Sequence, residues 1–89
     1  MDRAAFEREL RDAGYGDVLE NRSAPNRHND EHSHPFDVRA MVLEGELTLA
    51  WDGQSRTYRP GDVFTMARGC PHIEDFGPQG ALTLVGRKR

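Results

Sequence analysis

The sequence predicts an all-β fold, a small antiparallel sandwich or barrel that is preceded by one short helix. From about residue 17 onward, short apolar runs alternate with turn signals about every eight to twelve residues, which is typical of such folds. Before that point, apolar residues recur with the period of a helix. Because 89 residues make one domain, we expect an N-terminal helical arm over residues 1–16 and a barrel over residues 17–89.

The expected helix covers residues 2–13. Asp2 is of a residue type that caps helix N-termini, and Gly14 is placed to end the helix. The apolar residues of this segment fall on one face: Phe6, Leu10 and Ala13. A helix of this length is marginal on its own, so a frayed helical arm is the alternative.

Several short strands are expected in the rest of the chain. They cover residues 36–43, 46–51, 55–59, 63–67, 72–76 and 81–85. The turn signals between them are Gly45, Asp52–Gly53, Pro60–Asp62, Arg68–Pro71 and Gly77–Gly80. Among these, the Asp-Gly pair is the strongest hairpin signal. The stretch 20–34 is polar and is expected to be a loop.

The strand predicted at residues 36–43 is apolar on both faces in its second half. Ala40 and Val42 lie on one side, and Met41 and Leu43 lie on the other, because successive side chains of a strand alternate. Such a strand must be covered on both sides. The N-terminal helix or a second chain could provide the cover for the outer side.

The composition argues against several classes of protein. The formal net charge of -3 disfavours a general nucleic-acid binder, and the basic residues Arg87–Arg89 are expected to form a solvated tail. No apolar run approaches the roughly 20 residues of a membrane span, and the first residues lack the apolar segment of a signal peptide. Cys70 is the only cysteine, so no intrachain disulfide can form, which fits a cytoplasmic protein.

Two histidines are the first indication of function. On a strand, residues i and i+2 point to the same side, so His32 and His34 can approach one ion together from a single strand or from the entry to one. His72 follows a small hairpin further along the chain and could join them. Without His72, a histidine pair at the end of a polar loop would be the simpler interpretation.

The histidine pair lies in a pattern that resembles the first of the two sequence motifs of the cupins, a family of small antiparallel β-barrels of the jelly-roll type. That motif contains a glycine, a His-x-His pair, a glutamate and a second glycine. His32, His34 and Gly45 match it. Val38 stands in place of the glutamate, and Asn26 stands in place of the leading glycine.

The stretch that ends with the third histidine resembles the second cupin motif. Gly61, Gly69 and His72 match this motif, whereas Ala67 replaces its proline and Phe76 replaces its asparagine. The phrases VLEGE and PGD also look like cupin sequence. The resemblance therefore supports the fold and a metal site, and it does not single out one activity.

The resemblance, which covers about residues 26–76, implies a metal site. Cupins bind one divalent ion through the histidines and the glutamate of the first motif and the histidine of the second. Carried over to this chain, the ligands are His32, His34 and His72, and Val38 cannot contribute. Three neutral imidazoles suit a divalent transition metal (Fe, Mn, Zn, Ni or Cu) and leave positions open for water or substrate. Cupins also commonly pair through their sheets, so the resemblance implies a homodimer.

A carboxylate elsewhere in the chain could take the empty fourth place. Asp37 has the parity of the opposite face, so only a β-bulge would turn it inward. Glu74 shares its parity with His72 and is either a ligand or catalytic group of the site or an exposed strand residue. His28 and Cys70 are further candidates, although an ordinary loop residue is the simpler interpretation of each.

Three functions are compatible with such a site. A site of three histidines resembles that of cupin dioxygenases, which indicates a ferrous enzyme acting on a small molecule, with Glu74 as the candidate catalytic group. A binding module or sensor for a small ligand is the second function. A purely structural metal, which adds its binding energy to the stability of the fold, is the third.

The expected ligand cavity is apolar and has few charged neighbours. Parity predicts its lining to be Phe36, Val38, Ala40 and Val42, with Trp51 added if that side chain points inward. An anionic substrate would suit the net charge of the ion. Arg39 or Arg68 could orient its acid group, although Arg39 has the parity of the outer face.

Overall fold

The chain forms one helix and six strands in the computed structural model, which describes all residues from Met1 to Arg89. In chain order, these elements are α1 (Arg3–Asp12), β1 (Asp17–Ser23), β2 (His28–His32), β3 (Asp37–Trp51), β4 (Gln54–Tyr58), β5 (Val63–Met66) and β6 (His72–Lys88). Every strand pairing is antiparallel. The expected all-β fold with a short N-terminal helix is therefore confirmed. The single helix, α1, has neither the length nor the apolar composition of a membrane-spanning helix.

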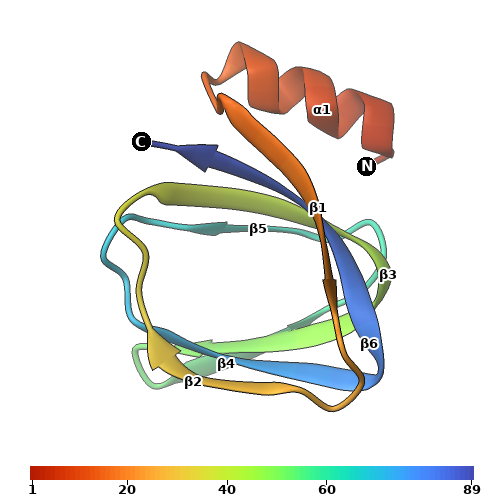
Figure 1. Ribbon diagram of the computed structural model, residues 1–89, viewed down its shortest axis with the longest axis vertical. Helices are drawn as coiled ribbons and strands as arrows, with labels where there is room; N and C mark the ends of the chain where they lie inside the picture. Colours follow the sequence, from red (N-terminus) through yellow and green to blue (C-terminus); the bar gives the residue numbers. More distant parts are fainter.

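The strands form one sheet that curls into a barrel-like shape. The path of the sheet is β1-β6-β3-β4, while β2 also pairs with β6 and β5 also pairs with β3. Figure 1 shows the strands arranged around a common interior, with α1 outside it. The outer strands β1, β2, β4 and β5 pair only with the two central strands, so the barrel is not closed by hydrogen bonds.

The two central strands bend at positions where breaks were expected. β3 continues through Gly45 and β6 continues through residues 77–80, so the prediction of separate strands there is wrong. Gly45 and Gly80 have positive φ angles, and the register of the β3–β6 pairing shifts around Gly45. A Cβ atom on Gly45 would clash with the Gly80 carbonyl group. Glycines and bulges thus let the paired strands turn a corner together (Figure 1).

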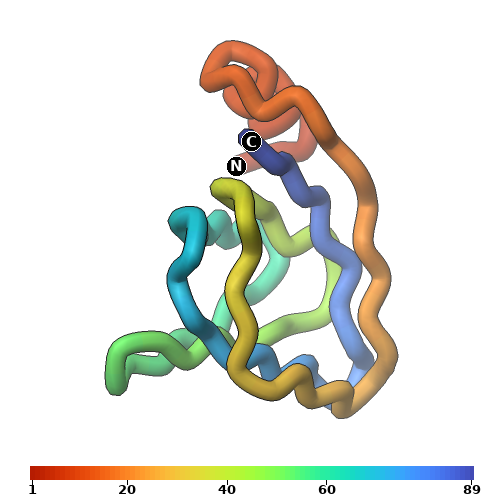
Figure 2. The backbone as a smooth tube through the Cα atoms, turned by 60° about the vertical axis from the view of Figure 1, so that its left-hand side comes forward, coloured from red at the N-terminus to blue at the C-terminus, as the bar shows by residue number.

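The polar stretch 20–34 also differs from the expectation, because most of it lies in β1 and β2 and not in a loop. Both strands pair with β6, and most of their side chains are exposed. Figure 2 shows β1 alongside the final part of β6. Backbone pairing with β6, and not burial of apolar side chains, places these residues in the sheet. Their sequence therefore lacks the alternation of apolar residues by which a strand is predicted.

The N-terminal helix covers the outer face of β3. α1 begins after Asp2, whose Oδ1 accepts a hydrogen bond from the Ala5 N–H at 2.8 Å. The apolar face of the helix forms a small core with the sheet, composed of Phe6, Leu10, Met41 and Leu84. The chain's own helix is therefore the cover that the sequence requires, and burial of its apolar face stabilises a helix that would be marginal alone.

The main core fills the interior of the barrel. It consists of Val38, Ala40, Val42, Leu47, Leu49, Tyr58, Met66, Phe76 and Ala81. As parity predicts, Val38, Ala40 and Val42 share this inner face of β3, while Met41 faces the helix. Val38 and Ala40 on this inner face line the same cavity as the predicted metal ligands His34 and His72.

Candidate metal centre

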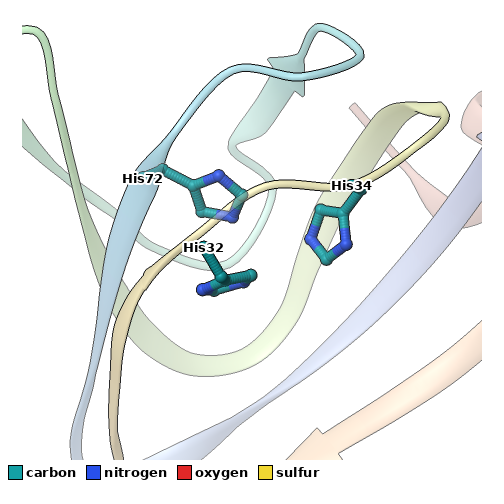
Figure 3. A group of neighbouring side chains, drawn as sticks. All are labelled: His32, His34 and His72. Carbon is teal, nitrogen blue, oxygen red and sulfur yellow. The ribbon is translucent and has the colours of Figure 1, made fainter.

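Three histidine side chains converge beside the main core. His32 ends β2, His34 lies in the link between β2 and β3, and His72 begins β6. One nitrogen atom from each ring lies within 4.8 Å of the others, and Figure 3 shows the three rings gathered around one space. These are the residues that the sequence predicts as metal ligands, and the fold brings all of them together.

Backbone hydrogen bonds orient two of the rings. His32 Nδ1 lies 2.8 Å from the carbonyl oxygen of Asp30, and His72 Nδ1 lies 3.1 Å from that of Cys70. Because a carbonyl oxygen only accepts hydrogen bonds, each Nδ1 carries a proton and donates. With the proton on Nδ1, Nε2 is the ring atom whose lone pair can bind a metal.

The third ring, that of His34, is kept neutral by its surroundings. Burial lowers the pKa of His34 because it removes water from the charged form, and the neighbouring His72 and His32 lower it further. The charge of Arg87 acts in the same direction, whereas that of Glu74 opposes it. The neutral imidazole is the form that binds a metal.

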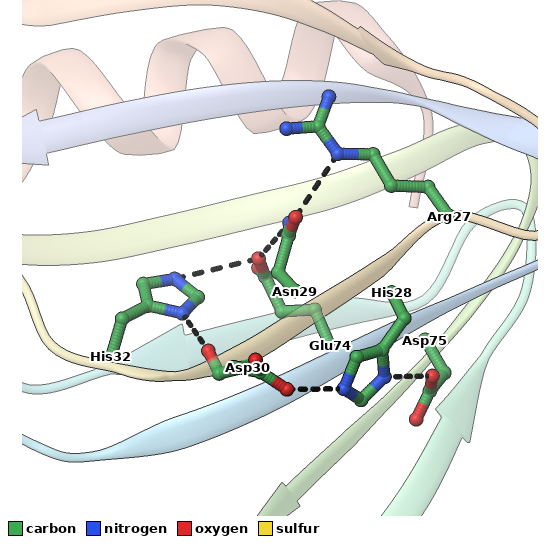
Figure 4. A network of polar contacts seen from close by, with 7 residues as sticks. All are labelled: Arg27, His28, Asn29, Asp30, His32, Glu74 and Asp75. Carbon is green, nitrogen blue, oxygen red and sulfur yellow. Dashed lines mark hydrogen bonds and ion pairs between the residues drawn. The ribbon is translucent and has the colours of Figure 1, made fainter.

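Glu74 points into the same space from β6. Its Oε1 lies 3.5 Å from His32 Nε2, and its Oε2 lies 3.9 Å from His72 Nε2. Asn29 donates a hydrogen bond to Oε1 at 2.9 Å and accepts one from Arg27 at 3.0 Å (Figure 4). The Glu74 side chain is only 20% exposed. Of the two interpretations of Glu74, the structure favours a residue of the site over an exposed strand residue.

This set of donor atoms fits a divalent transition metal. Nitrogen ligands bind zinc at about 2.0–2.1 Å, which puts neighbouring ligands of a tetrahedral site roughly 3.4 Å apart. The distances from the Glu74 carboxylate to the two Nε2 atoms, 3.5 and 3.9 Å, are close to that value. The histidine nitrogens lie within 4.8 Å of one another, so side-chain movements that draw them closer would let the three imidazoles hold an ion with the Glu74 carboxylate beside it.

The other candidates from the sequence lie outside this cluster. Asp37 neither joins the cluster nor lines the adjoining cavity, and its Oδ1 accepts a hydrogen bond from the Arg68 N–H at 2.8 Å. His28 is exposed. Cys70 is half-buried, with its thiol facing the carbonyl oxygen of the next residue. Val38, at the position of the motif glutamate, is buried in the main core.

A cavity of about 160 Å³ adjoins the histidines. Ten of its sixteen lining residues are hydrophobic, and His34, His72 and Glu74 form part of its wall. Of the apolar residues expected to line it, three do so: Phe36, Val38 and Ala40. Two do not line it: Val42 and Trp51. The first is enclosed by the main core, and the second stands at the end of β3 next to a tight turn.

The cavity also contains a cation that the sequence analysis missed. Arg87 lines it, whereas the expected candidates Arg39 and Arg68 do not. Arg39 instead faces α1, as its parity predicts. The expectation of a solvated tail is wrong for Arg87, because β6 continues to Lys88 and alternation from Val85 turns Arg87 inward. That alternation is the one signal in the sequence that could have revealed it. Lys88 and Arg89 are exposed, as expected.

Comparison with known proteins identifies the family of the chain. A protein-family model described as a cupin domain matches residues 21–74. The chain belongs to the cupin family. The matched segment contains all three histidines of the cluster, so the resemblance from which this cupin's site was predicted is confirmed.

Several solved structures are similar to this cupin. A protein of unknown function from Rhizobium leguminosarum is 28% identical with a TM-score of 0.76, over 80% of this chain and 67% of that one. KdgF from Halomonas sp. is 19% identical with a TM-score of 0.67, over 81% and 67%. An HTH_3 family transcriptional regulator from Vibrio cholerae is 16% identical with a TM-score of 0.68, over 81% and 42%. The last two likenesses show the fold alone. No curated protein matches the chain.

Proposed function

We propose that this cupin binds one divalent transition-metal ion through His32, His34 and His72 and uses it in a reaction on a small molecule. The observation that carries the proposal is the convergence of three imidazoles beside a mostly apolar cavity, whose wall includes two of them, His34 and His72. Two of these rings have their Nε2 lone pairs freed by backbone hydrogen bonds. Such a site keeps an ion beside a space in which a ligand can be held.

The reaction class that we propose is that of a metal-dependent oxidoreductase of the dioxygenase type. A bound ferrous ion would supply the redox chemistry with O₂. The chain's own residues contribute the walls, which hold the small molecule next to the histidines. The apolar side chains of Val38, Ala40 and Met66 line this space and exclude bulk water from it.

Glu74 is proposed as the carboxylate of the site. The first cupin motif has its glutamate where this chain has Val38 on β3, whereas Glu74 comes from β6. The hydrogen bond from Asn29 holds one carboxylate oxygen in place. A carboxylate so positioned can either complete the ligand set or accept a proton from a molecule held in the cavity.

Metal binding is tested on the purified chain by metal analysis and by competition titration with a chelator. His72→Ala is expected to weaken binding by more than about 100-fold, because loss of even an outer partner of a ligand costs about 10- to 100-fold. His28→Ala is the matched control and is expected to keep the wild-type affinity, since His28 lies outside the cluster. A His72→Ala protein that retains its metal, or a wild-type chain that binds none, contradicts the proposal.

The role of Glu74 is tested with Glu74→Gln, with Asp75→Asn on the same strand as the control. If Glu74 is a ligand, the metal affinity of Glu74→Gln falls by about tenfold or more. If Glu74 accepts a proton, the metal affinity stays at the wild-type value and only turnover is lost. A Glu74→Gln protein that equals the wild type in both respects argues against any role in the site.

A binding module without catalysis is the second candidate function. The fold-level similarity to an HTH_3 family regulator favours it. Uptake of O₂ when a small molecule is added to the iron-loaded chain would support the enzyme. Saturable binding of that molecule without turnover would support the module. A chelator-induced fall in Tm with neither ligand binding nor turnover would indicate a structural metal.

We also propose that the protein acts in the cytoplasm as a homodimer. The single cysteine, which is free in the structure, fits a reducing compartment. The apolar outer face of β3 does not itself require a second chain, because α1 already covers it. Sedimentation of the purified chain checks it, and a monomer at all protein concentrations would contradict it.

A further inference from the structure

One permanently charged cation in the cavity pairs with no acid of the chain. Arg87 is half-buried, and its guanidinium makes no hydrogen bond or ion pair with another residue. The two basic residues that follow are both held by partners: Lys88 Nζ donates to the Ala13 carbonyl at 2.9 Å, and Arg89 pairs with Asp17 at 3.4 Å. A half-buried cation without a partner is unfavourable. Its partner is therefore expected to come from outside the chain.

An aromatic ring connects this cation with the histidine cluster. The Arg87 Cζ atom lies 5.1 Å from the centroid of the Phe36 ring. His34 stacks on the same ring, with centroids 5.2 Å apart and ring planes 18° apart. All three residues line the cavity. A molecule in the cavity can therefore contact the guanidinium and the histidine cluster at once, with its body against Phe36.

The size and lining of the cavity restrict the ligand further. A cavity of about 150 Å³ accommodates a molecule the size of benzene, and this one measures about 160 Å³. The fork of a guanidinium matches a carboxylate through two parallel hydrogen bonds. A doubly charged phosphate would need further cationic donors, and no second Arg or Lys lines the cavity.

We infer that the cavity binds a small organic carboxylate of about the size of benzene, with its acid group on Arg87 and its apolar body directed along Phe36 toward the histidine cluster. This inference names the ligand class of the proposed function and rests on that proposal only for the metal at the other end. Glu74 lies beside the histidines. The ligand's acid group is therefore expected at the Arg87 end, where it avoids repulsion by the Glu74 carboxylate.

The test compares carboxylates with amides of nearly the same shape. Benzoate and benzamide, and the straight-chain acids from butanoate to octanoate with their amides, are titrated calorimetrically into the metal-free full chain. At least one carboxylate is expected to bind about tenfold more tightly than its amide, as a charge-assisted hydrogen-bonded pair allows. Arg87→Gln is expected to abolish this difference and to leave the affinity for the amide unchanged. Arg87→Lys, which keeps the charge without the fork, is expected to have an intermediate preference.

Arg89→Gln is the matched control for general charge. Arg89 also lies over Phe36, at 5.2 Å, but it pairs with Asp17 and does not line the cavity. It is expected to keep the wild-type preference for carboxylates. An equal loss in Arg89→Gln and Arg87→Gln overturns the inference. So does equal affinity for acids and amides throughout the series, including no measurable binding of either.

Metal binding by the same proteins separates this inference from the proposed function. If the wild type binds no metal but still prefers carboxylates through Arg87, the metal proposal fails and the inference stands. If the wild type and Arg87→Gln bind metal equally and neither prefers carboxylates, the inference fails and the metal proposal stands.

Discussion

Two histidine environments lie only a few residues apart and differ in their affinity for protons. His28 is exposed, and both of its ring nitrogens face carboxylates (Figure 4): Nδ1 lies 2.5 Å from Asp75, and Nε2 lies 2.8 Å from Asp30. The hydrogen bond with Asp75, followed by that with Asp30, raises the pKa of His28. The charged imidazolium is the form that can donate to both partners.

The cluster of His32, His34 and His72 has the opposite character (Figure 3). Burial and the adjacent imidazoles lower the pKa of His34. The other two rings donate from Nδ1 to backbone carbonyl groups and not to carboxylates. His28 therefore favours its charged form, whereas His34 in the cluster favours the neutral form, which is the one that can bind a metal.

An irregularity in β2 separates these two environments. The register of the β2–β6 pairing shifts between Asn29 and His32. Before the shift, His28 is exposed and Asn29 is turned toward Glu74; after it, His32 joins the cluster. In a regular strand, His28 and His32 would share one face. One bulge is enough to place two neighbouring histidines in opposite surroundings.

The largest expected effect on the free energy of unfolding comes from removing one histidine of the cluster while the exposed His28 and its two carboxylate partners are left unchanged. At a metal concentration of about 1,000 times Kd, the wild type is expected to gain about 4 kcal/mol in free energy of unfolding. His34→Ala is expected to lose most of this gain, because one of the three converging nitrogen donors is removed. Denaturant unfolding with and without zinc measures the gain in each protein.

The exposed histidine supplies the control for that measurement. His28→Ala is expected to retain the full stabilisation by zinc, since its ring contacts only Asp30 and Asp75. If His28→Ala loses as much of the zinc effect as His34→Ala does, the two environments are not separate and the assignment of the ion to the cluster is wrong.

A smaller effect is expected from pH, because protons compete with the metal for the cluster. Metal affinity should fall as the pH drops below about 6.5, where free imidazoles become charged. The lowered pKa of His34 means that this ring resists protonation and stays neutral further into the acid range than a free imidazole. Competition titrations between about pH 8 and pH 5 measure the profile. An affinity that does not change over this range would contradict metal binding by imidazoles, and His28→Ala should leave the profile unchanged.

The parts of the fold that repeat with a period were predictable, and the corners were not. Phe6 and Leu10 mark a helix face, and alternation along β3 correctly places Val38 and Ala40 inside. Gly45, in contrast, has the same appearance in a sequence whether it ends a strand or bends it. The close approach of the Gly80 backbone decides in favour of a bend, and only the paired structure contains that information.

The site shows the same division between pattern and pairing. The three histidines follow from a motif, and parity with His72 made Glu74 a candidate whose role only the structure could decide. Arg87 was not a candidate at all. Glu74 belongs to the site because the bulge in β2 brings His32 opposite His72 on β6. Arg87 lies in a run of charges whose composition suggests solvent exposure, while its pairing opposite Val38 on β3 turns it inward. The type of these two residues does not by itself predict that either one faces the site.

The smallest expected effect concerns the exposed His28, its pKa and the stability that its charged form contributes. Asp75→Asn removes the main cause of the raised pKa of His28, so the midpoint of its NMR titration should fall toward the usual value while the Asp30 contact keeps part of the shift. A pKa raised by folding adds stability that is present in full below about pH 6.5, the unfolded value, and is lost as the pH rises through the folded value.

The stability difference between the wild type and Asp75→Asn should therefore appear on the acid side and diminish as the pH rises past the midpoint of His28. Denaturant unfolding of the metal-free proteins at a series of pH values measures it. The titration of His34 should be the same in both proteins, because Asp75 faces solvent on the other side of the bulge. A shift of His34 together with His28 would show that the bulge does not insulate the metal cluster from the surface charges.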